Sequence, residues 1–505
     1  MSNNNRRFVE WICRYLLIFA LINVLVVICS PNLYKEIYAA KKKTTSAKTK
    51  SKKASKSKTS KKNYSKLSNK KNNNPEHIFL ADTLLADGIS YKRVLININN
   101  SKQDVHILQV NLNNPKVDIA TFKAGNNITE LARLPELLMS SNTNKDPNDQ
   151  QVVAGINANF WRAYTNYPIG PTVVNGEVVE MPTHKRWTST FINENCKPFM
   201  SNFYLQGEIV TKNYRQNFKS VNRRSDATGI VMYNRFGGDV IPYINSKKVE
   251  ELLAKGLDNI FQEAAYDDST EQAVSLEQYR LELIEAQRAS NSEYSLQKVT
   301  LKYLDNPSVN TFVKCEVVSI DTGSVAIPPG CCVISYGNDI DLNTLPKIGE
   351  KVNIHFWTNV YENEIFLNSV SGTPRLVRDG IAQHEAYEEG SKSKRFINGA
   401  LARTAIGFDK DKSNFFMVVI DPRRENGTVG ASLTQLAYIM EYIGCYSAQN
   451  LDGGGSTTMV INNKNTLGNV LSSNDPSASR RLSVALGAVS LKKEKEGVKA
   501  KPRKR

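Results

Sequence analysis

The sequence lacks any pair of cysteines at the spacing of a metal site, and it has few cysteines altogether. Seven occur in 505 residues, and two of these, Cys13 and Cys29, lie in an apolar N-terminal region. Of the other five, Cys331 and Cys332 are adjacent and rarely form a disulfide with each other. The sequence leaves open whether the five cysteines form one or two disulfides. We predict no metal site and no cofactor, which argues against a phosphatase or nuclease that depends on metal-ligand clusters.

The sequence also lacks an apolar run that is clearly long enough to span a bilayer. Residues 15–29 are apolar apart from Asn23, and three arginines precede them. Fifteen residues fall short of the about 20 that a membrane-spanning helix needs, which is typical of the core of an export signal. Ala39 and Ala40 offer small residues for cleavage, but bulky side chains precede both. We therefore expect residues 1–40 to be a signal peptide or an N-terminal membrane anchor, and the rest of the chain to be extracytoplasmic.

Residues 41–74 contain no acidic side chain. They carry fourteen lysines among Ser, Thr and Asn, and the basic tail 491–505 adds to a net charge of +17 for the whole chain. Such segments cannot bury enough apolar surface to fold, so both are predicted to be disordered. Lysine runs bind phosphates, but an exported chain meets anionic glycopolymers or lipid headgroups instead of nucleic acid. A spacer without any partner is the alternative.

The body, residues 75–490, has the pattern of a folded domain. Strands are predicted at 94–98, 105–112 and 152–161, with a helix at 131–139 and a hairpin turn at Asn175-Gly176. A segment at about 246–298 is rich in Glu, Gln, Leu and Ala and predicts a helical insertion. We expect the α+β class, with one large mixed sheet, flanking helices and this insertion.

The last third of the body predicts a strand, a helix and a polar loop in succession. The strand covers residues 415–420 and a capping box, Ser432 with Gln435, begins the helix. Gly444 ends the helix, and closing strands are predicted at 458–461 and 482–489.

The loop that follows the helix is the most informative stretch of the chain. It reads Asn450-Leu451-Asp452-Gly453-Gly454-Gly455-Ser456-Thr457-Thr458-Met459-Val460. Consecutive glycine amides can form a concave site for phosphate oxygens, because glycine adopts positive φ and lets a ligand approach closely. A tight turn without a ligand is the alternative.

Several motifs occur in one order along the body. They are Gly155-Ile156-Asn157-Ala158-Asn159-Phe160, Pro168-Ile169-Gly170, residues 372–380 (GTPRLVRDG), Arg403-Thr404-Ala405-Ile406-Gly407, the helix at Ser432 and the loop 450–460. In this combination the chain resembles the phosphodiester glycosidase family over about residues 93–490. The chain departs from the family pattern in two places. After Asn157 it has Ala158 and Asn159, where the family commonly has glycine. Near the end of the domain, an asparagine of the family pattern is missing after Arg480 and Arg481.

The resemblance implies cleavage of the bond between the anomeric carbon of a sugar and a phosphate that is esterified to a second group. Because the leaving group is a phosphate monoester, neutralising its charge matters more than protonating it. The planar guanidinium of arginine suits phosphate oxygens. Arg403, Arg378 and one of Arg480 and Arg481 are the candidates, and a structural ion pair is the alternative for each.

Asp452 is the best candidate for stabilising the oxocarbenium-like centre, as nucleophile or as base for water. Its alternative role is structural, with the carboxylate accepting amides of the glycine turn. Asp379 and Asp421 are further catalytic candidates, although Asp-Gly and Asp-Pro are also ordinary turns. The predicted substrate-binding residues are Asn157, Asn159, Phe160, Arg378, Gly453, Gly454, Gly455, Ser456, Thr457, Arg480 and Arg481.

Two functions fit these features. One is an exported glycosidase that hydrolyses sugar-1-phosphodiesters, in an envelope glycopolymer or exopolysaccharide. The other is a non-catalytic module that binds anionic glycans through the same pocket. The partner in either case is a phosphodiester-linked sugar or an anionic glycopolymer, with the membrane as a further partner of the N-terminal segment.

Overall fold

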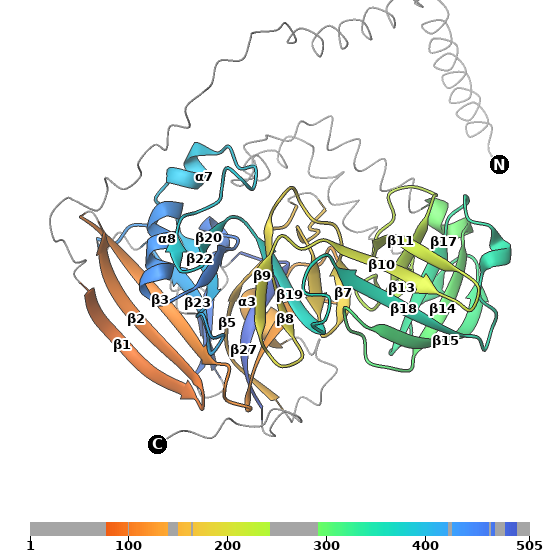
Figure 1. The fold of residues 1–505 in the computed structure, drawn as a ribbon, viewed down its shortest axis with the longest axis horizontal. Coiled ribbons are helices and arrows are strands. Elements are labelled where there is room, and N and C mark those ends of the chain that lie inside the picture. The colour runs from red at the N-terminus through yellow and green to blue at the C-terminus, as the bar shows by residue number, and fades with distance from the viewer. Residues whose placement is uncertain are drawn as a thin grey trace, which may run out of the picture. The chain divides into compact units, whose positions relative to one another are not determined.

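The computed structural model describes residues 77–98, 100–139, 150–162, 165–242, 291–422, 427–463, 466–469 and 480–491. Strands dominate this part of the chain, and they form three larger sheets, a closed barrel and a two-stranded pair (Figure 1). The predicted N-terminal segment, the lysine-rich linker, the basic tail and most of the insertion lie outside the described residues. None of the described helices is long and apolar enough to cross a membrane.

The first sheet has eight strands, and the candidate loop follows one of its inner strands, β24 (Ser447–Asn450). Its order is β1 (His77–Ala86), β2 (Ile89–Ile98), β3 (Ser101–Asn111), β23 (Asn414–Ile420), β22 (Arg403–Phe408), β24, β20 (Arg375–Arg378) and β21 (Ile381–Ala382).

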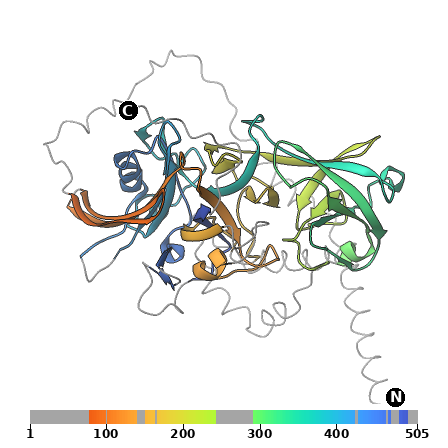
Figure 2. The ribbon, with the colours of Figure 1, turned by 90° about the horizontal axis from the view of Figure 1, so that it is seen from below.

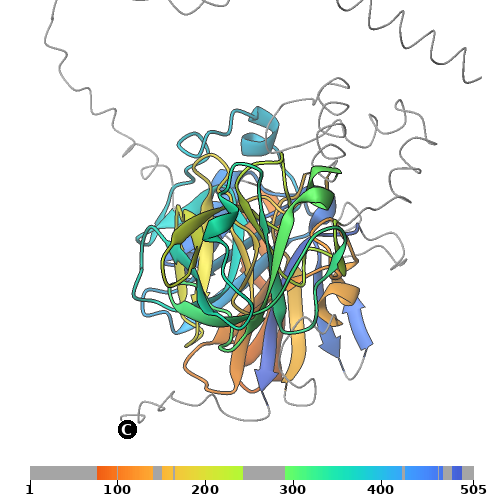
Figure 3. The ribbon, with the colours of Figure 1, turned by 90° about the vertical axis from the view of Figure 1, so that its right-hand side faces the viewer.

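The second sheet joins distant parts of the chain. Its order is β26 (Thr466–Asn469), β25 (Met459–Asn463), β5 (Gln150–Asn157), β27 (Val484–Leu491) and β4 (Val117–Lys123). β27 lies between β5 and β4 and is antiparallel to both. Figures 1 and 3 show β27 and β5 side by side.

The third sheet connects the first two to the barrel. Its order is β7 (Glu177–Glu180), β6 (Thr172–Val174), β19 (Phe366–Gly372), β8 (Thr188–Asn193) and β9 (Pro198–Ser201). The predicted hairpin at Asn175-Gly176 joins β6 to β7, and both turn residues have positive φ, as a two-residue turn of this kind requires.

The barrel closes when β18 pairs with both β10 and β15. Its order is β10 (Leu205–Val210), β11 (Arg215–Val221), β12 (Ile230–Tyr233), β17 (Cys331–Tyr336), β14 (Gln297–Tyr303), β15 (Phe312–Asp321) and β18 (Lys351–Thr358). The separate pair is β13 (Val240–Ile241) with β16 (Val325–Ala326).

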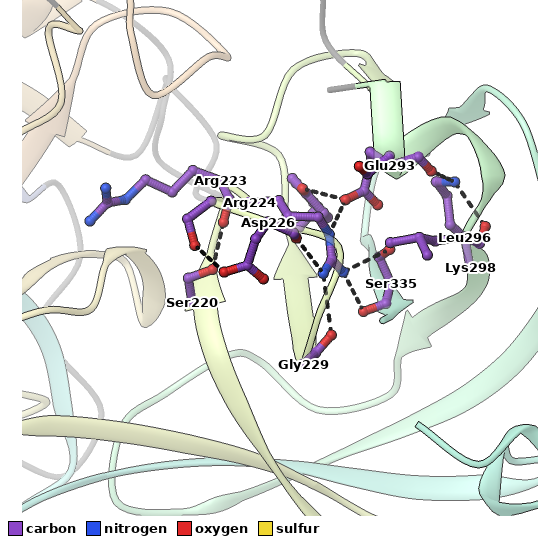
Figure 4. Close-up of polar contacts among 12 residues, drawn as sticks. Ser220, Arg223, Arg224, Asp226, Gly229, Glu293, Leu296, Lys298 and Ser335 are labelled. Carbon is purple, nitrogen blue, oxygen red and sulfur yellow. Dashed lines mark hydrogen bonds and ion pairs between the residues drawn. The ribbon is translucent and has the colours of Figure 1, made fainter. Parts of the chain in front are cut away.

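A buried ion pair holds the described end of the predicted insertion against the barrel (Figure 4). Residues 291–295 are helical, and Glu293 pairs with Arg224 while both side chains are 2% exposed. Arg224 also donates to the Ser335 carbonyl at 3.0 Å, and the Tyr233 hydroxyl donates to Glu293 at 3.0 Å. Because every charge in this cluster has a partner, the cluster is tolerated in the interior.

Three α-helices are named among the described residues: α3 (Leu134–Met139), α7 (Lys394–Asn398) and α8 (Leu433–Tyr442). Two short 3-10 turns, η2 (Leu342–Thr344) and η4 (Gly454–Ser456), complete the elements. α8 packs Leu433, Leu436 and Met440 against the first sheet, and Figure 2 shows it on the concave side of β1 to β3. The opposite face of this sheet shares a core with the second and third sheets.

The predicted capping box at the start of α8 is confirmed. The Gln435 amide donates to the Ser432 hydroxyl at 3.2 Å, and the Ser432 amide donates to the Gln435 side chain at 2.9 Å. Gly444 follows the helix with a φ of 98°. Most predicted strands are also present, although the structure is richer in strand than the α+β class suggested.

One feature of the fold differs from the expectation, and another answers a question that the sequence left open. The closed barrel was not foreseen, because alternation within one strand does not tell which distant strand it pairs with. Cys315, Cys331, Cys332 and Cys445 are free thiols. Cys315, Cys332 and Cys445 are buried in apolar surroundings, which raises the pKa of Cys332 and Cys445.

Replacing Ser432 with Ala should lower the free energy of unfolding by about 1 kcal/mol, because the first turn of α8 loses its cap. Urea denaturation measures this difference. Thr434→Ala is the matched control, since Thr434 is exposed in the same turn and should change stability by less than about 0.5 kcal/mol. Equal effects of the two variants would contradict a role for the cap.

The stability of the fold should depend on pH through Lys123. Burial lowers the pKa of this amine from 10.5 to about 7, and its Nζ donates to the carbonyls of Ala124 at 2.9 Å and Glu130 at 2.8 Å. Between these two pKa values the unfolded chain binds a proton that the folded protein has released. The free energy of unfolding should therefore rise with pH, by at most about 1.4 kcal/mol per pH unit.

Denaturation of the wild type and of Lys123→Met between pH 6.5 and 9.5 checks this dependence. The slope attributed to Lys123 should be missing in the methionine variant. Parallel pH profiles of the two proteins would show that Lys123 does not titrate in this range.

Candidate functional site

The backbone of Asp452 is held on both sides by the end of β5. The Asp452 amide donates to the Ala158 carbonyl at 3.0 Å, and Asn157 Nδ2 donates to the Asp452 carbonyl at 2.6 Å. The residue is partly exposed. A carboxylate on a fixed backbone at the surface is the arrangement that a reacting group needs, because positioning lowers the barrier.

Asn157 is the residue that joins the elements of the site. Its side chain is buried, and its Oδ1 accepts from the Thr404 hydroxyl at 2.8 Å and from the Thr458 amide at 3.0 Å. One amide therefore connects β5, β22 and both ends of the glycine loop. Asn157 was predicted to bind substrate, and the structure gives its side chain a position within the protein instead.

The glycine loop runs along the end of β22. The Leu451 amide donates to the Thr404 carbonyl at 2.9 Å, and the Gly454 amide donates to the Ala402 carbonyl at 2.8 Å. A Cβ at Gly453 would lie 2.9 Å from that same carbonyl, and Gly454 has a φ of 57°. Both positions therefore require glycine for close approach and for backbone conformation.

Most amides of this loop are already bonded. Those of Ser456 and Thr457 donate to the carbonyls of Gly453 and Gly454. Within the described part of the chain, the amides of Gly453 and Gly455 have no partner. A phosphate could thus accept hydrogen bonds from two backbone amides of this loop. That is fewer than a concave site made by all of its amides would offer.

Arg480 is the predicted arginine that reaches the loop. Its Nη1 donates to the Ser456 hydroxyl at 3.4 Å and lies 3.8 Å from the position of a Cβ on Gly455. The guanidinium carbon is 5.9 Å from the centroid of the Trp161 ring, and Arg480 is exposed. Arg481 is exposed beside it. Arg480 therefore places a positive charge next to the free amide of Gly455.

The backbone of Arg403 lies next to the loop, but its side chain is buried. Its Nε donates to the Ala431 carbonyl at 2.8 Å, and its Nη2 donates to the carbonyls of Phe396 at 2.7 Å and Gly399 at 3.1 Å. The guanidinium also lies 5.3 Å from the Phe396 ring centroid. These contacts fix the end of α7 to β22.

The pKa of His384, a residue that the sequence did not indicate, depends in part on the charge of Arg403. Burial lowers the pKa of His384, and the Arg403 guanidinium lowers it further, against the opposing effect of Glu388. The imidazole is therefore mainly neutral at pH 7. Its Nδ1 is buried without a partner among the described residues.

Arg378 and Asp379 lie at the far end of β24 from Asp452. The Gly380 amide donates to the Tyr446 carbonyl at 2.9 Å, just before β24 begins. The seven residues from 446 to 452 span roughly 20 Å of extended chain. Arg378 forms a two-pronged ion pair with Glu385, and a hydrogen bond to Asp379 raises the pKa of Tyr446. The structure does not bring these two predicted residues to the loop.

Asp421 follows β23 at the same end of the strands as the loop that follows β24. β22 pairs Arg403 with Ile420, so Asp421 follows opposite Ala402. Two strand spacings, roughly 10 Å, separate it from Gly453. Its amide donates to the Asp104 carbonyl at 3.0 Å. It remains a candidate for a second carboxylate.

Asn159 and Phe160 continue β5 into the interior. Asn159 Nδ2 donates to the Thr172 hydroxyl at 2.9 Å, and its Oδ1 accepts from the Ser371 amide at 3.1 Å. Phe160 makes an edge contact with Trp187 at 5.3 Å and is 7% exposed. Asn159 thus connects the end of β5 to the third sheet, whereas Phe160 packs in the core that contains Trp187 and Phe396. Both side chains are buried.

No group of three or more His, Cys, Asp or Glu side chains is placed to hold a metal ion in the part of the chain that the structure describes. A cavity of about 540 Å³ lies elsewhere, between β7 and the barrel. Its charged lining residues are Glu177, Arg235, Asp239 and Asp305, and Glu177 pairs with Arg235. This cavity is separate from the loop at Asp452.

The sequence did not reveal Thr404 or Ala402 as part of the site. Thr404 lies in the Arg403-Thr404-Ala405-Ile406-Gly407 motif, in which the charge of Arg403 is the stronger sign of function. The period of a strand places Thr404 and Arg403 on opposite faces. The hydroxyl therefore faces Asn157 while the guanidinium faces α7.

Residues 317–489 match the family model described as phosphodiester glycosidase. The predicted resemblance to the phosphodiester glycosidase family is confirmed for this part of the chain.

Two of the relatives are known enzymes. The chain is 33% identical over 105 residues to N-acetylglucosamine-1-phosphodiester alpha-N-acetylglucosaminidase of Bos taurus, with 19% of each chain covered. It is 36% identical over 106 residues to the protein of the same name in Homo sapiens, with 19% of this chain and 20% of that one covered. The chain thus matches about a fifth of the length of these curated relatives.

A solved structure of a hypothetical protein from Synechocystis is similar in fold. Its TM-score is 0.53 at 19% identity, and the alignment covers 81% of this chain and 63% of that chain. The likeness extends well beyond the segment that the enzymes share.

Replacing Asn157 with Ala should lower the free energy of unfolding by roughly 2 to 4 kcal/mol, because buried partners on three segments lose their hydrogen bonds. The Thr458 amide should also exchange faster with solvent. Urea denaturation and hydrogen exchange measure the two effects. Asn213→Ala, in an exposed turn, is the control and should change neither; an Asn157→Ala protein with wild-type exchange at Thr458 would contradict the assignment.

Proposed function

We propose that the protein hydrolyses the bond between the anomeric carbon of a sugar and the phosphate of a phosphodiester. The observation that carries this proposal is the fixed backbone of Asp452, held between Ala158 and Asn157 at 3.0 and 2.6 Å, with Arg480 at the same loop. The family match supports the reaction class.

In this proposal Asp452 acts at the anomeric carbon. As the bond to phosphate breaks, positive charge develops on the sugar ring, and a nearby carboxylate stabilises it. Asp452 then either bonds to the carbon or accepts a proton from the attacking water. Its backbone hydrogen bonds keep the carboxylate in place during this step.

Arg480 acts on the leaving group. The phosphate gains negative charge as the bond breaks, and the exposed guanidinium of Arg480 supplies a planar pair of donors. The amides of Gly453 and Gly455, which have no partner among the described residues, are further donors in the same loop. Trp161 lies under the guanidinium, so it limits the positions that Arg480 can take.

The substrate setting follows from the ends of the chain. An export segment at residues 1–40 would place the enzyme outside the cytoplasm, where sugar phosphodiesters occur in envelope glycopolymers and exopolysaccharides. The alternative is a non-catalytic module that binds anionic glycans at the same loop. The partly exposed loop of Asp452 is open to either kind of ligand.

Asp452→Asn tests the enzyme against the binding module. The variant should lose hydrolysis of a sugar-1-phosphodiester by about 100-fold or more while it still binds the polymer, because the change removes one negative charge and keeps the shape. Release of free sugar and polymer co-sedimentation are the measurements. Absence of turnover by the wild type on a panel of sugar phosphodiesters, with polymer binding intact, would favour the module.

Arg480→Lys and Arg481→Lys form a matched pair. We expect the first to reduce kcat/KM by roughly 10-fold to 100-fold, since lysine lacks the fork geometry, and the second to be nearly silent. Steady-state kinetics decide between them. Equal losses, or a loss confined to Arg481→Lys, would reassign the phosphate contact.

A further inference from the structure

The outermost strand of the first sheet, β1, is unusually apolar for its exposure. Ile78, Phe79, Leu80 and Leu84 are 48%, 66%, 46% and 72% exposed. Among the described strands β1 pairs with β2 alone, and Figure 1 shows it at the end of the sheet. An exposed apolar edge strand is a site of association in a stable protein.

Helix α8 extends this surface on one side. Tyr438 and Tyr442 are one helical turn apart and are 37% and 45% exposed. The Tyr442 ring stacks on His77, the first residue of β1, at 4.2 Å. Phe79 is two residues further along an unbulged part of the strand, so it lies on the same side as His77. Leu84 pairs with Ser90 and Phe79 with Val94, so both lie on this side of the sheet, whereas Ile78 lies on the other face. We call Phe79, Leu84, Tyr438 and Tyr442 the β1 patch.

The sequence just before β1 indicates what covers this patch. Residues 41–74 carry fourteen lysines and no acid, and the last lysine, Lys71, is six residues before His77. A strongly basic segment therefore enters the fold at the apolar edge. Near an anionic membrane each lysine contributes about 1 kcal/mol of attraction at moderate ionic strength.

We propose that the β1 patch docks on the surface of an anionic lipid bilayer, a partner that the positive charge of the preceding sequence favours. Phenylalanine and leucine side chains gain from leaving water, and tyrosines favour the interface between headgroups and chains. The exposed carboxylate of Asp82 in β1 opposes this contact, but the fourteen lysines outweigh it. The inference does not depend on the proposed catalytic activity.

A second copy of the chain is a less suitable partner for the same surface. Pairing of two β1 edges would bring two lysine-rich segments to one place, where their charges repel each other. An anionic bilayer meets the apolar side chains and the lysines together. Charge complementarity therefore favours the lipid surface.

Hydrogen exchange of the full chain tests the proposal locally, because the apolar run at 15–29 could hold the protein on any bilayer. On phosphatidylcholine vesicles with 30% phosphatidylglycerol, the amides of β1 should exchange at least about tenfold more slowly than on pure phosphatidylcholine. The slowing should disappear in 0.5 M salt. The amides of β15 serve as the internal control and should not change.

Two variants complete the test. Phe79→Ser combined with Leu84→Ser should abolish the lipid-dependent slowing, whereas Leu342→Ser should retain it, because Leu342 is 56% exposed on η2 and lies outside the patch. Equal exchange on neutral and anionic vesicles would overturn the proposal, as would slowing in the double variant. Slowing that grows with protein concentration in the absence of vesicles would show that a second copy is the partner.

Discussion

The buried side chain of Asn157 is the interaction on which the site depends. Its three hydrogen bonds, to the Asp452 carbonyl, the Thr404 hydroxyl and the Thr458 amide, join strands that are hundreds of residues apart in the sequence. If the Asn157 amide lost its partners, it would carry the full cost of desolvation. The three segments are therefore held in fixed positions relative to one another. The position of the Asp452 carboxylate follows from this constraint and not from the flexible glycines alone.

The arginines show how a fold divides residues of one type among different tasks. Arg403 is buried and holds carbonyls near α7 and α8, Arg378 pairs with Glu385 at the surface, and Arg480 reaches Ser456. Their side chains differ in environment because strand alternation turns Arg403 away from Thr404, and because β24 separates Arg378 from the loop. A phosphate at the loop therefore meets Arg480 first.

Much of the local structure could be predicted from the sequence. The capping box at Ser432, the turn at Asn175-Gly176 and the strand before Asp421 follow from short-range rules, since each depends on residues close together in the chain. The barrel could not be predicted, because its closure depends on which distant strands pair. Similarly, the motif that contains Asn157 could be found in the sequence, but the role of its side chain could not. The sequence does not distinguish an asparagine that is buried from one that binds a sugar.

In the proposed reaction, water attacks the anomeric carbon and not the phosphorus. Hydrolysis of a sugar-1-phosphodiester in water enriched in oxygen-18 distinguishes the two. Attack at carbon gives free sugar with the label at its anomeric hydroxyl and an unlabelled phosphate monoester on the second group. Label in the phosphate, with release of sugar-1-phosphate, would show that the phosphorus is attacked and that the proposed reaction is wrong.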